Sequence, residues 1–448
     1  MVRLALGRPA PSLLLTTPAA AGCCRPRWRQ YSTRVARTYW VETLGCPKNQ
    51  VDSDKLIGTL QADGFTAAAA PETADLVVVN TCAFIEAARE ESVATVLSLA
   101  ASRQAGAELV VTGCLAERYG AELADALPET TVVGFGVPVT LGPKPRVPEF
   151  DLLNLPRPKA TAPWAYVKVA EGCDRTCGFC AIPSFRGRQR SRSVSSILSE
   201  VDALAVQEVV LVAQDLASYG RDDHRAGAIV SLVRDVAARV PRTRLLYLYP
   251  SELTDSLIDV IGETGVPYFD LSLQHVAKHH LRRMRRWGDG KRFLERIATI
   301  RRRYPDAAFR SSFIIGYPGE TEDDHDQLLA FLGEAQLDWA GFFAFSREEG
   351  THATTLPDPV PADLVTERLR EVSELQDAIS ATRRQALIGS ELEVLVDEPG
   401  IARSHREAPE IDGVVTVPST LPVGTFARVK VTAATGPDLD ATPTGADA

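Results

Sequence analysis

Residues 171–180 read Glu171-Gly172-Cys173-Asp174-Arg175-Thr176-Cys177-Gly178-Phe179-Cys180, which is a Cys-x3-Cys-x2-Cys pattern. Structural zinc is held by four closed tetrahedral ligands, and the nearest histidine, His224, lies 44 residues beyond Cys180. A disulfide framework would leave one of the three cysteines unpaired. Three thiolates without a fourth ligand instead fit a four-iron iron–sulfur cluster that keeps one iron open for another ligand.

Strand-like and helical patterns alternate around this stretch, from residue 164 to residue 387. Strands are expected at Tyr166–Ala170, Glu208–Ala213, Arg244–Tyr249, Tyr268–Leu273, Ala308–Gly316 and Trp339–Phe345. Helices are expected at Ser195–Ala205, Ile229–Arg239, Leu253–Glu263, Lys291–Arg303, Glu322–Gln336 and, closing the domain, Pro361–Leu387. Six such units predict a partial (β/α)6 barrel, in which ligands gather at the carboxyl ends of the strands. The Cys173 loop follows the first strand, as this architecture requires.

Three further cysteines lie in residues 37–147, where the pattern predicts an open parallel α/β domain. Strands are expected at Thr38–Leu44, Asp75–Asn80, Glu108–Thr112 and Thr131–Gly134, and helices at Val51–Asp63, Ile85–Ser102 and Leu115–Ala126. Cys46, Cys82 and Cys114 each follow a strand and precede a helix. Because the carboxyl ends of parallel strands share one edge of a sheet, we expect the three thiols to converge into a second iron–sulfur site. Three unrelated buried residues at strand ends are the alternative.

The composition changes at both ends of the barrel region. Six prolines in residues 141–163 predict a stiff linker, assigned to 148–163. Residues 388–448 predict a small β-barrel with strands at Glu391–Val396, Ile401–Arg403, Gly413–Val417 and Thr425–Thr432, followed by a disordered tail from Gly436 onward.

Charge is unevenly distributed along the chain. Residues 1–41 contain seven arginines and no acidic residue, whereas the remainder has 42 basic and 58 acidic residues. A transit peptide, a disordered extension and a start codon placed too early all fit a leader at 1–36, which includes Cys23 and Cys24. The acidic body argues against tight non-specific nucleic-acid binding. No apolar run approaches the roughly 20 residues of a membrane helix, so we expect a cytoplasmic protein with no membrane partner.

Several motifs, taken in order along the chain, resemble the radical S-adenosylmethionine methylthiotransferases, and most closely their RimO type. They are Leu44–Asn49, Asn80–Cys82, Val111–Leu115, Glu171–Gly187, Leu273–His275 and Ile315–Thr321. The Gly45–Asn49 and Leu273–His275 motifs, with Ala408–Gly413, differ from the pattern of the sister MiaB type, which modifies tRNA. Ser272 and Trp287 stand where this family would show prolines.

The resemblance implies an N-terminal cluster domain, a radical core and a C-terminal TRAM barrel. It implies two [4Fe-4S] clusters and S-adenosyl-L-methionine as cofactors. The cysteines at 173, 177 and 180 would hold the cluster that generates a 5′-deoxyadenosyl radical, and those at 46, 82 and 114 the cluster that delivers sulfur. The substrate would be the β-carbon of an aspartate in small-subunit ribosomal protein twelve, free or within the ribosome, with a reduced electron donor as partner. A tRNA adenosine beside the anticodon is the alternative substrate, and a non-catalytic iron–sulfur or zinc RNA-binding protein the alternative class.

Other site residues are assigned on their position only. Phe179 is expected to shape the loop over the adenine, and Gly316 to let the backbone approach the adenosyl group. Gln274 with His275, and Gln214 with Asp215, are candidates to bind ribose or methionine, or else merely polar caps of barrel strands. The arginines at 186, 188, 190 and 192 are expected to form a solvated or partner-facing strip, and the basic stretch Lys278–Arg303 either a solvated helix surface or an RNA-contacting face.

Overall fold

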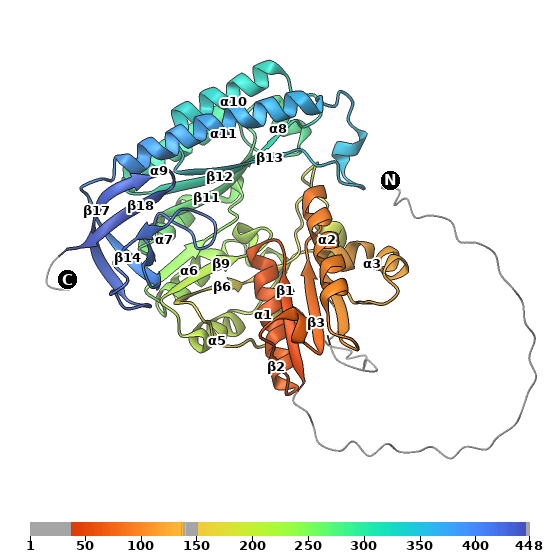
Figure 1. Ribbon diagram of the computed structural model, residues 1–448. Helices are drawn as coiled ribbons and strands as arrows, with labels where there is room; N and C mark the ends of the chain where they lie inside the picture. The colour runs from red at the N-terminus through yellow and green to blue at the C-terminus, as the bar shows by residue number, and fades with distance from the viewer. Residues whose placement is uncertain (1–36, 136, 138, 140–150, 445–448) are drawn as a thin grey trace, which may run out of the picture. The chain divides into compact units, whose positions relative to one another are not determined.

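The computed structural model describes residues 37–135, 137, 139 and 151–444 (Figure 1). The expected leader at 1–36, with Cys23 and Cys24, lies outside these residues, as does the part of the Pro-rich segment at 140–150. Among the helices that are described, none combines the length and apolar character needed to cross a membrane.

The N-terminal domain is an open five-stranded sheet in the order β2-β1-β3-β4-β5, with every neighbouring pair parallel. Its strands are β1 (Thr38–Thr43), β2 (Thr66–Ala67), β3 (Leu76–Thr81), β4 (Glu108–Gly113) and β5 (Thr131–Val132), and its helices are α1 (Pro47–Ala62), α2 (Glu86–Ser102) and α3 (Cys114–Ala126). All six residues of β3 are buried, as in a central parallel strand covered on both faces. The predicted parallel sheet is therefore confirmed. Strand β2 was not predicted, because two exposed residues leave no hydrophobic pattern.

The central domain has the six expected strands. They are β6 (Trp164–Lys168), β9 (Glu208–Val212), β10 (Arg242–Leu245), β11 (Tyr268–Gln274), β12 (Ala308–Ile315) and β13 (Trp339–Ala344). They form two parallel sheets, β6-β9-β10 and β11-β12-β13, which a parallel bridge between Leu248 and Leu271 joins into one partial barrel. A short antiparallel pair, β7 (Ala170–Glu171) with β8 (Arg190–Ser191), flanks the cysteine loop.

Helices cover these strands. They are α4 (Ile182–Arg186), α5 (Val194–Leu204), α6 (Ala228–Ala237), α7 (Asp255–Glu263), α8 (Lys278–Arg283), α9 (Gly290–Arg303), α10 (Glu322–Ala335) and α11 (Ala362–Gln385). Short 3-10 turns occur at Pro71–Thr73, Leu152–Asn154, Leu216–Ser218, Arg221–Asp223, Pro250–Glu252 and His352–Thr355. Helix α11 lies beside α10 and packs on β13 (Figure 1).

Successive residues of the barrel strands belong to different hydrophobic clusters, as the two-residue period of a strand requires. Val209 and Leu211 pack in the cluster that contains the covering helices, whereas Val210 packs in a second cluster. That second cluster also contains Val51 of α1 and Ala408 of the C-terminal domain. Both flanking domains therefore share hydrophobic core with the barrel.

The C-terminal domain is a closed barrel in the order β14-β15-β16-β18-β17. Its strands are β14 (Glu391–Glu398), β15 (Ile401–Arg403), β16 (Val415–Thr416), β17 (Phe426–Thr435) and β18 (Asp438–Pro443). The prediction of a disordered tail from Gly436 is wrong as far as residue 444, because β18 pairs with β16 and β17 and buries Leu439 and Ala441. Two apolar residues among Asp, Thr and Pro gave too weak an alternation to indicate a strand.

Candidate active site

The Cys173 loop leaves β7 through Gly172, whose φ of +78° is in the region that favours glycine. A Cβ on Gly172 would lie 2.2 Å from the carbonyl oxygen of Arg188. The backbone N–H of Cys173 donates to the carbonyl of Gly187 at 3.1 Å. Only glycine fits at residue 172, because a Cβ atom there would clash with Arg188. The lack of a side chain lets the loop pack closely against the segment that leads into β8.

The second half of the loop is anchored by the barrel. Gly178 donates its N–H to the carbonyl of Met284 at 2.8 Å, and its own carbonyl accepts from the N–H of Ala353 at 2.7 Å. The guanidinium of Arg286 donates to the sulfur of Cys177 at 3.3 Å. Burial raises the pKa of the Cys173 thiol to about 11 and that of Cys180 to about 12. Metal ions bind the thiolate, so filling this site must release protons.

Arg175, inside the loop, ties it to the neighbouring strand ends. Its guanidinium pairs with Asp215 at 2.6 Å and Glu252 at 3.0 Å, and lies 4.0 Å from the ring centroid of Tyr249. Gln214 and Asp215, predicted at the end of the second barrel strand, each keep one buried side-chain oxygen without a hydrogen-bond partner in the described structure. Buried oxygens of this kind are usually satisfied in the functional state, so these two residues remain candidates for ligand binding.

The N-terminal cysteines converge as predicted. Cys46 caps the N-terminus of α1, Cys82 directly follows β3 and Cys114 is the first residue of α3. Gly113 has a φ of +93°, and a Cβ there would lie 2.5 Å from the backbone nitrogen of Thr81. This close approach of two strand ends brings Cys82 and Cys114 to the same edge of the sheet.

Asn49, on the first turn of α1, holds the three N-terminal segments together. Its amide nitrogen donates to the carbonyls of Leu44 and Thr81, at 2.8 and 3.1 Å, and its side-chain oxygen lies 3.7 Å from the sulfur of Cys114. Burial raises the pKa of Cys82 to about 11 and also raises that of Cys114. Burial acts the same way on Cys46, but Lys48 and Arg186 outweigh it and hold the pKa of Cys46 below its ordinary value.

In neither cysteine trio do all three sulfurs lie as close together as around a single tetrahedral ion. A tetrahedral ion with metal–sulfur bonds of about 2.3 Å would bring its sulfurs to about 3.8 Å of one another. Within the described residues, the only groups of three ligand-type side chains whose atoms all lie within 4.8 Å consist of histidines and carboxylates. Neither cysteine trio is among these groups.

A buried network of ion pairs joins the two cysteine sites. Asp52 of α1 is paired with Lys168 and Arg186 of the central domain, and Glu171, which precedes the Cys173 loop, pairs with the same two cations. Although burial opposes it, Arg186 and Lys168 lower the pKa of Glu171 to about 2. Gln214 donates to the other oxygen of Glu171 at 2.6 Å. The network balances two positive charges with two negative ones.

The expected arginine strip is therefore only half correct. The side chains of Arg188 and Arg190 are 92% and 60% exposed. Those of Arg186 and Arg192 are only 3% and 2% exposed, because each pairs with buried acceptors. The prediction failed for these two because an arginine in the sequence reads as a surface residue unless its partners, which are distant along the chain, are known.

Phe179 packs partly buried against the hydrophobic core of the barrel. Gly316 lies at the end of β12 with a φ of +80°, and a Cβ there would lie 2.4 Å from Val365 of α11. Packing of that helix thus explains the glycine, and the contact with an adenosyl group stays a prediction. Gln274 ends β11 with a φ of +71°, and no hydrogen bond of its side chain to another described residue identifies a role.

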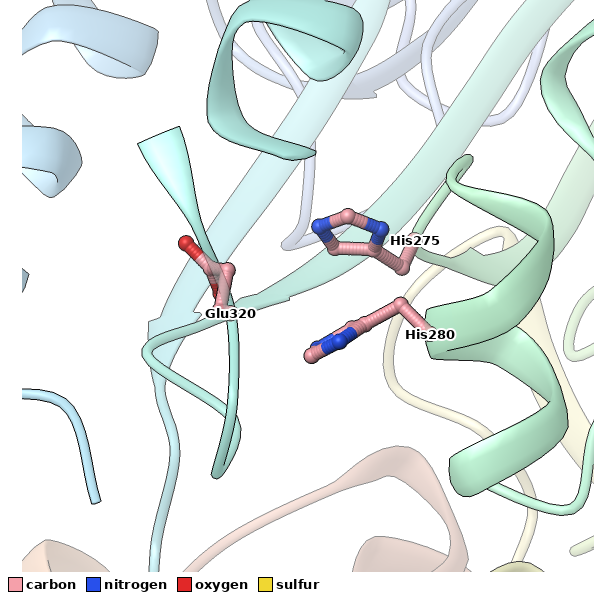
Figure 2. Close-up of side chains that lie close together, drawn as sticks. All are labelled: His275, His280 and Glu320. Atoms are coloured by element: carbon pink, nitrogen blue, oxygen red, sulfur yellow. The ribbon is translucent and has the colours of Figure 1, made fainter. Parts of the chain in front are cut away.

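His275 instead points into a buried group with His280 and Glu320 (Figure 2). Burial lowers the pKa of His275 well below its ordinary value and that of His280 to about 4. The Nδ1 atom of His275 accepts from the N–H of Ala277 at 3.1 Å, so the neutral ring carries its proton on Nε2. In this geometry that nitrogen is a hydrogen-bond donor.

Matches to family models cover each domain in turn. Residues 38–134 match the model described as uncharacterized protein family UPF0004, residues 167–332 the radical SAM superfamily, and residues 388–443 the TRAM domain. With the two cysteine sites, these matches define a radical S-adenosylmethionine enzyme that carries an additional N-terminal domain.

Similar curated proteins narrow the class. The ribosomal protein uS12 methylthiotransferase RimO of Moorella thermoacetica is 41% identical over 88% of this chain and 96% of its own. The RimO of Streptomyces coelicolor is 39% identical over 91% of this chain and 97% of its own. The chain belongs to the RimO family of methylthiotransferases, and the resemblance inferred from its motifs is confirmed.

Solved structures give weaker likenesses. The radical S-adenosylmethionine methyltransferase TsrM from Kitasatospora setae, with cobalamin and a [4Fe-4S] cluster bound, aligns with a TM-score of 0.46 and 14% identity over 85% of this chain and 82% of that one. At this score the likeness adds nothing to the assignment.

Proposed function

We propose that this chain transfers a methylthio group to the β-carbon of an aspartate in ribosomal protein uS12. The observation that carries the proposal is the presence of two three-cysteine sites in adjacent domains. Relatives of almost the same length, named for this substrate, support the choice of uS12 over a tRNA.

Two [4Fe-4S] clusters are proposed as cofactors together with S-adenosyl-L-methionine. A cluster on Cys173, Cys177 and Cys180, with S-adenosylmethionine on its open iron, would supply the radical chemistry that an unactivated carbon requires. Three thiolates and no fourth protein ligand suit that role. The side chains of Arg175 and Arg286 hold the loop in place, the first through Asp215 and the second through the sulfur of Cys177.

The second trio is proposed to hold the cluster that provides sulfur. Cys46 is the N-cap residue of α1 and Cys114 is the first residue of α3, so both lie at helix N-termini, where the helix dipole favours thiolates. Lys48, beside Cys46, places its ammonium group 3.3 Å from the ring centroid of Tyr247, which follows β10. This contact brings the Cys46 loop to the carboxyl edge of the barrel, where a substrate could meet both sites.

The domain boundaries are proposed at 37–147, 148–163, 164–387 and 388–448.

The arginines of the basic stretch, Lys278–Arg303, are partly neutralised: Arg296 pairs with Asp255 at 2.7 Å, and Arg303 pairs with Asp259. This pairing favours a solvated helix surface over an RNA-contacting face.

Mass spectrometry of uS12 and of tRNA, from cells with and without the gene, tests the substrate. We expect the methylthio mass on the uS12 aspartate to disappear with the gene while tRNA methylthiolation is unchanged. The reverse result would assign the chain to tRNA. Anaerobic reconstitution tests the cofactors, and about eight irons per chain are expected for two four-iron clusters. One zinc per chain with no cleavage of S-adenosylmethionine would refute an enzyme of this class.

A further inference from the structure

One buried guanidinium contacts a cysteine of the N-terminal trio and Glu171, which lies two residues before Cys173. Arg186 is the last residue of α4 in the central domain, six residues beyond Cys180. Its Nη2 atom donates to the sulfur of Cys114 at 3.1 Å and to the side-chain oxygen of Asn49 at 2.6 Å. Its Nη1 atom donates to Asp52 at 2.9 Å and to Glu171 at 3.0 Å. Four acceptors from two domains are thus held by one side chain.

The geometry requires arginine in particular. A guanidinium presents five donors in a rigid planar fork, whereas a lysine ammonium is a single point on a flexible stem. The ring of Phe135 lies against the same group, with its centroid 4.1 Å from the Cζ atom of Arg186. Lys168, which contacts Asp52 and Glu171, does not contact Cys114 or Asn49. Of the two cations in the network with Asp52 and Glu171, only Arg186 contacts a sulfur of the N-terminal trio, that of Cys114.

The connection to the radical site is also short. Glu171 is followed by Gly172 and Cys173, and its carboxylate is fixed by Arg186, Lys168 and Gln214. A shift of the guanidinium would therefore move the start of the Cys173 loop and release Cys114 at the same time.

We propose that Arg186 is a positioning residue that fixes the two cysteine trios relative to each other, and that its charge raises the reduction potential of the cluster held by the N-terminal trio. The proposal rests on the proposed function, because it requires a cluster at that site. The physical reason is that reduction adds an electron beside the cation, and a buried cation at this distance is poorly screened.

The test uses the full chain with the three cysteines at 173, 177 and 180 replaced by alanine, so that only the N-terminal site is reconstituted. Arg186→Gln is compared with this parent in an anaerobic redox titration followed by electron paramagnetic resonance, with iron content measured on the same samples. We expect about four irons per chain in both, and at least a tenfold lower ratio of reduced to oxidised cluster in Arg186→Gln at a given potential, which is about 59 mV for one electron.

Two further variants control the test. Arg188→Gln removes an arginine whose side chain is 92% exposed, and it should leave the potential unchanged. Arg186→Lys keeps the charge without the fork, so it should restore part of the shift in potential. In the enzyme with all six site cysteines, the same Lys variant should yield at least tenfold less methylthiolated product per S-adenosylmethionine cleaved. If Arg186→Gln does not retain iron, Arg186→Lys tests the positioning role instead, because it keeps the charge. A reduced yield of product in Arg186→Lys would then support that role.

The outcomes separate the two proposals. A parent that binds no iron at Cys46, Cys82 and Cys114 would overturn the proposed function along with this inference. A parent with four irons whose potential is the same in Arg186→Gln would overturn the inference alone. Full coupling of cleavage to product in Arg186→Lys would overturn the positioning role.

Discussion

Glu208, the first residue of β9, joins the central domain to the C-terminal barrel. Its replacement by glutamine should weaken the contact between these two domains. Its side chain is fully buried and accepts from Arg244 at 2.7 Å and from Arg403 of β15 at 3.1 Å. Although burial opposes it, these two arginines lower the pKa of Glu208 to about 2. Glutamine keeps the shape but leaves the cations without their shared anion.

The magnitude follows from that pKa. The change from an ordinary value of 4.5 to about 2 corresponds to about 3 kcal/mol, at 1.36 kcal/mol per pKa unit. Removing one partner of a buried ion pair costs about 3–5 kcal/mol in other proteins. We therefore expect Glu208→Gln to lower the free energy of unfolding by about 3 kcal/mol at pH 7.

The dependence on pH has a fixed sign. Between pH 2 and pH 4.5 the unfolded chain binds the proton of this carboxyl and the folded chain does not, so folding stability rises with pH in that window. The difference between Glu208 and the glutamine variant should be constant above about pH 5 and shrink as the pH falls toward 2.

Urea unfolding followed by tryptophan fluorescence measures the difference in the free energy of unfolding between the two proteins. Trp164 can report on this contact because its ring centroid lies 5.7 Å from the Cζ atom of Arg403. Glu393→Gln is the matched control, because the side chain of Glu393 is 60% exposed and its ion pair with Arg242 is long, at 3.5 Å. Changes at exposed sites are usually within about 0.5 kcal/mol. A loss below 1 kcal/mol in Glu208→Gln, or a difference that grows on acidification, would refute the reasoning.

Three further changes probe the site and the barrel. Cys46→Ala should abolish methylthiolation but leave cleavage of S-adenosylmethionine measurable by chromatography, whereas Cys177→Ala should abolish cleavage; equal loss in both would contradict the division of labour between the two sites. Gly172→Ala should reduce the iron content after reconstitution by about half, because its Cβ would meet the carbonyl of Arg188 at 2.2 Å, while Gly64→Ala, with a φ of +86° and open space around it, should keep full iron. Leu439→Ala should cost about 2–5 kcal/mol in urea unfolding if β18 closes the barrel, and an effect below 0.5 kcal/mol would argue that the strand is not docked.

The cysteine sites could be predicted from the sequence because their placement depends only on topology. Parallel strands end at one edge of a sheet, so residues that follow β3 and β4 must be neighbours even though 32 residues separate Cys82 from Cys114. The six barrel strands and the long final helix follow from periodicity.

The charged network could not be predicted, because ion pairs depend on which side chains meet after folding. Arg186 and Asp52 are 134 residues apart, and nothing local to either marks the other. The strand β18 was missed for a different reason. Its core-facing residues are Leu439 and Ala441, and their burial is decided by pairing with β17 rather than by their own hydrophobicity.

The residues that connect the two sites lie inside the same short motifs as the cysteines. Asn49 and Asp52 follow Cys46 on the first turns of α1, and Glu171 precedes Cys173. The contact between the N-terminal and central domains is therefore built in part from the cysteine loops, and pairs outside them, such as Lys55 with Glu200 and Arg89 with Glu348, add to it. A substitution of Asn49, Asp52 or Glu171 acts within six residues of a cysteine, so buried charge pairs beside the cysteines help to fix the distance between the two sites. Neutralising Asp52 should therefore lower the yield of methylthiolated product.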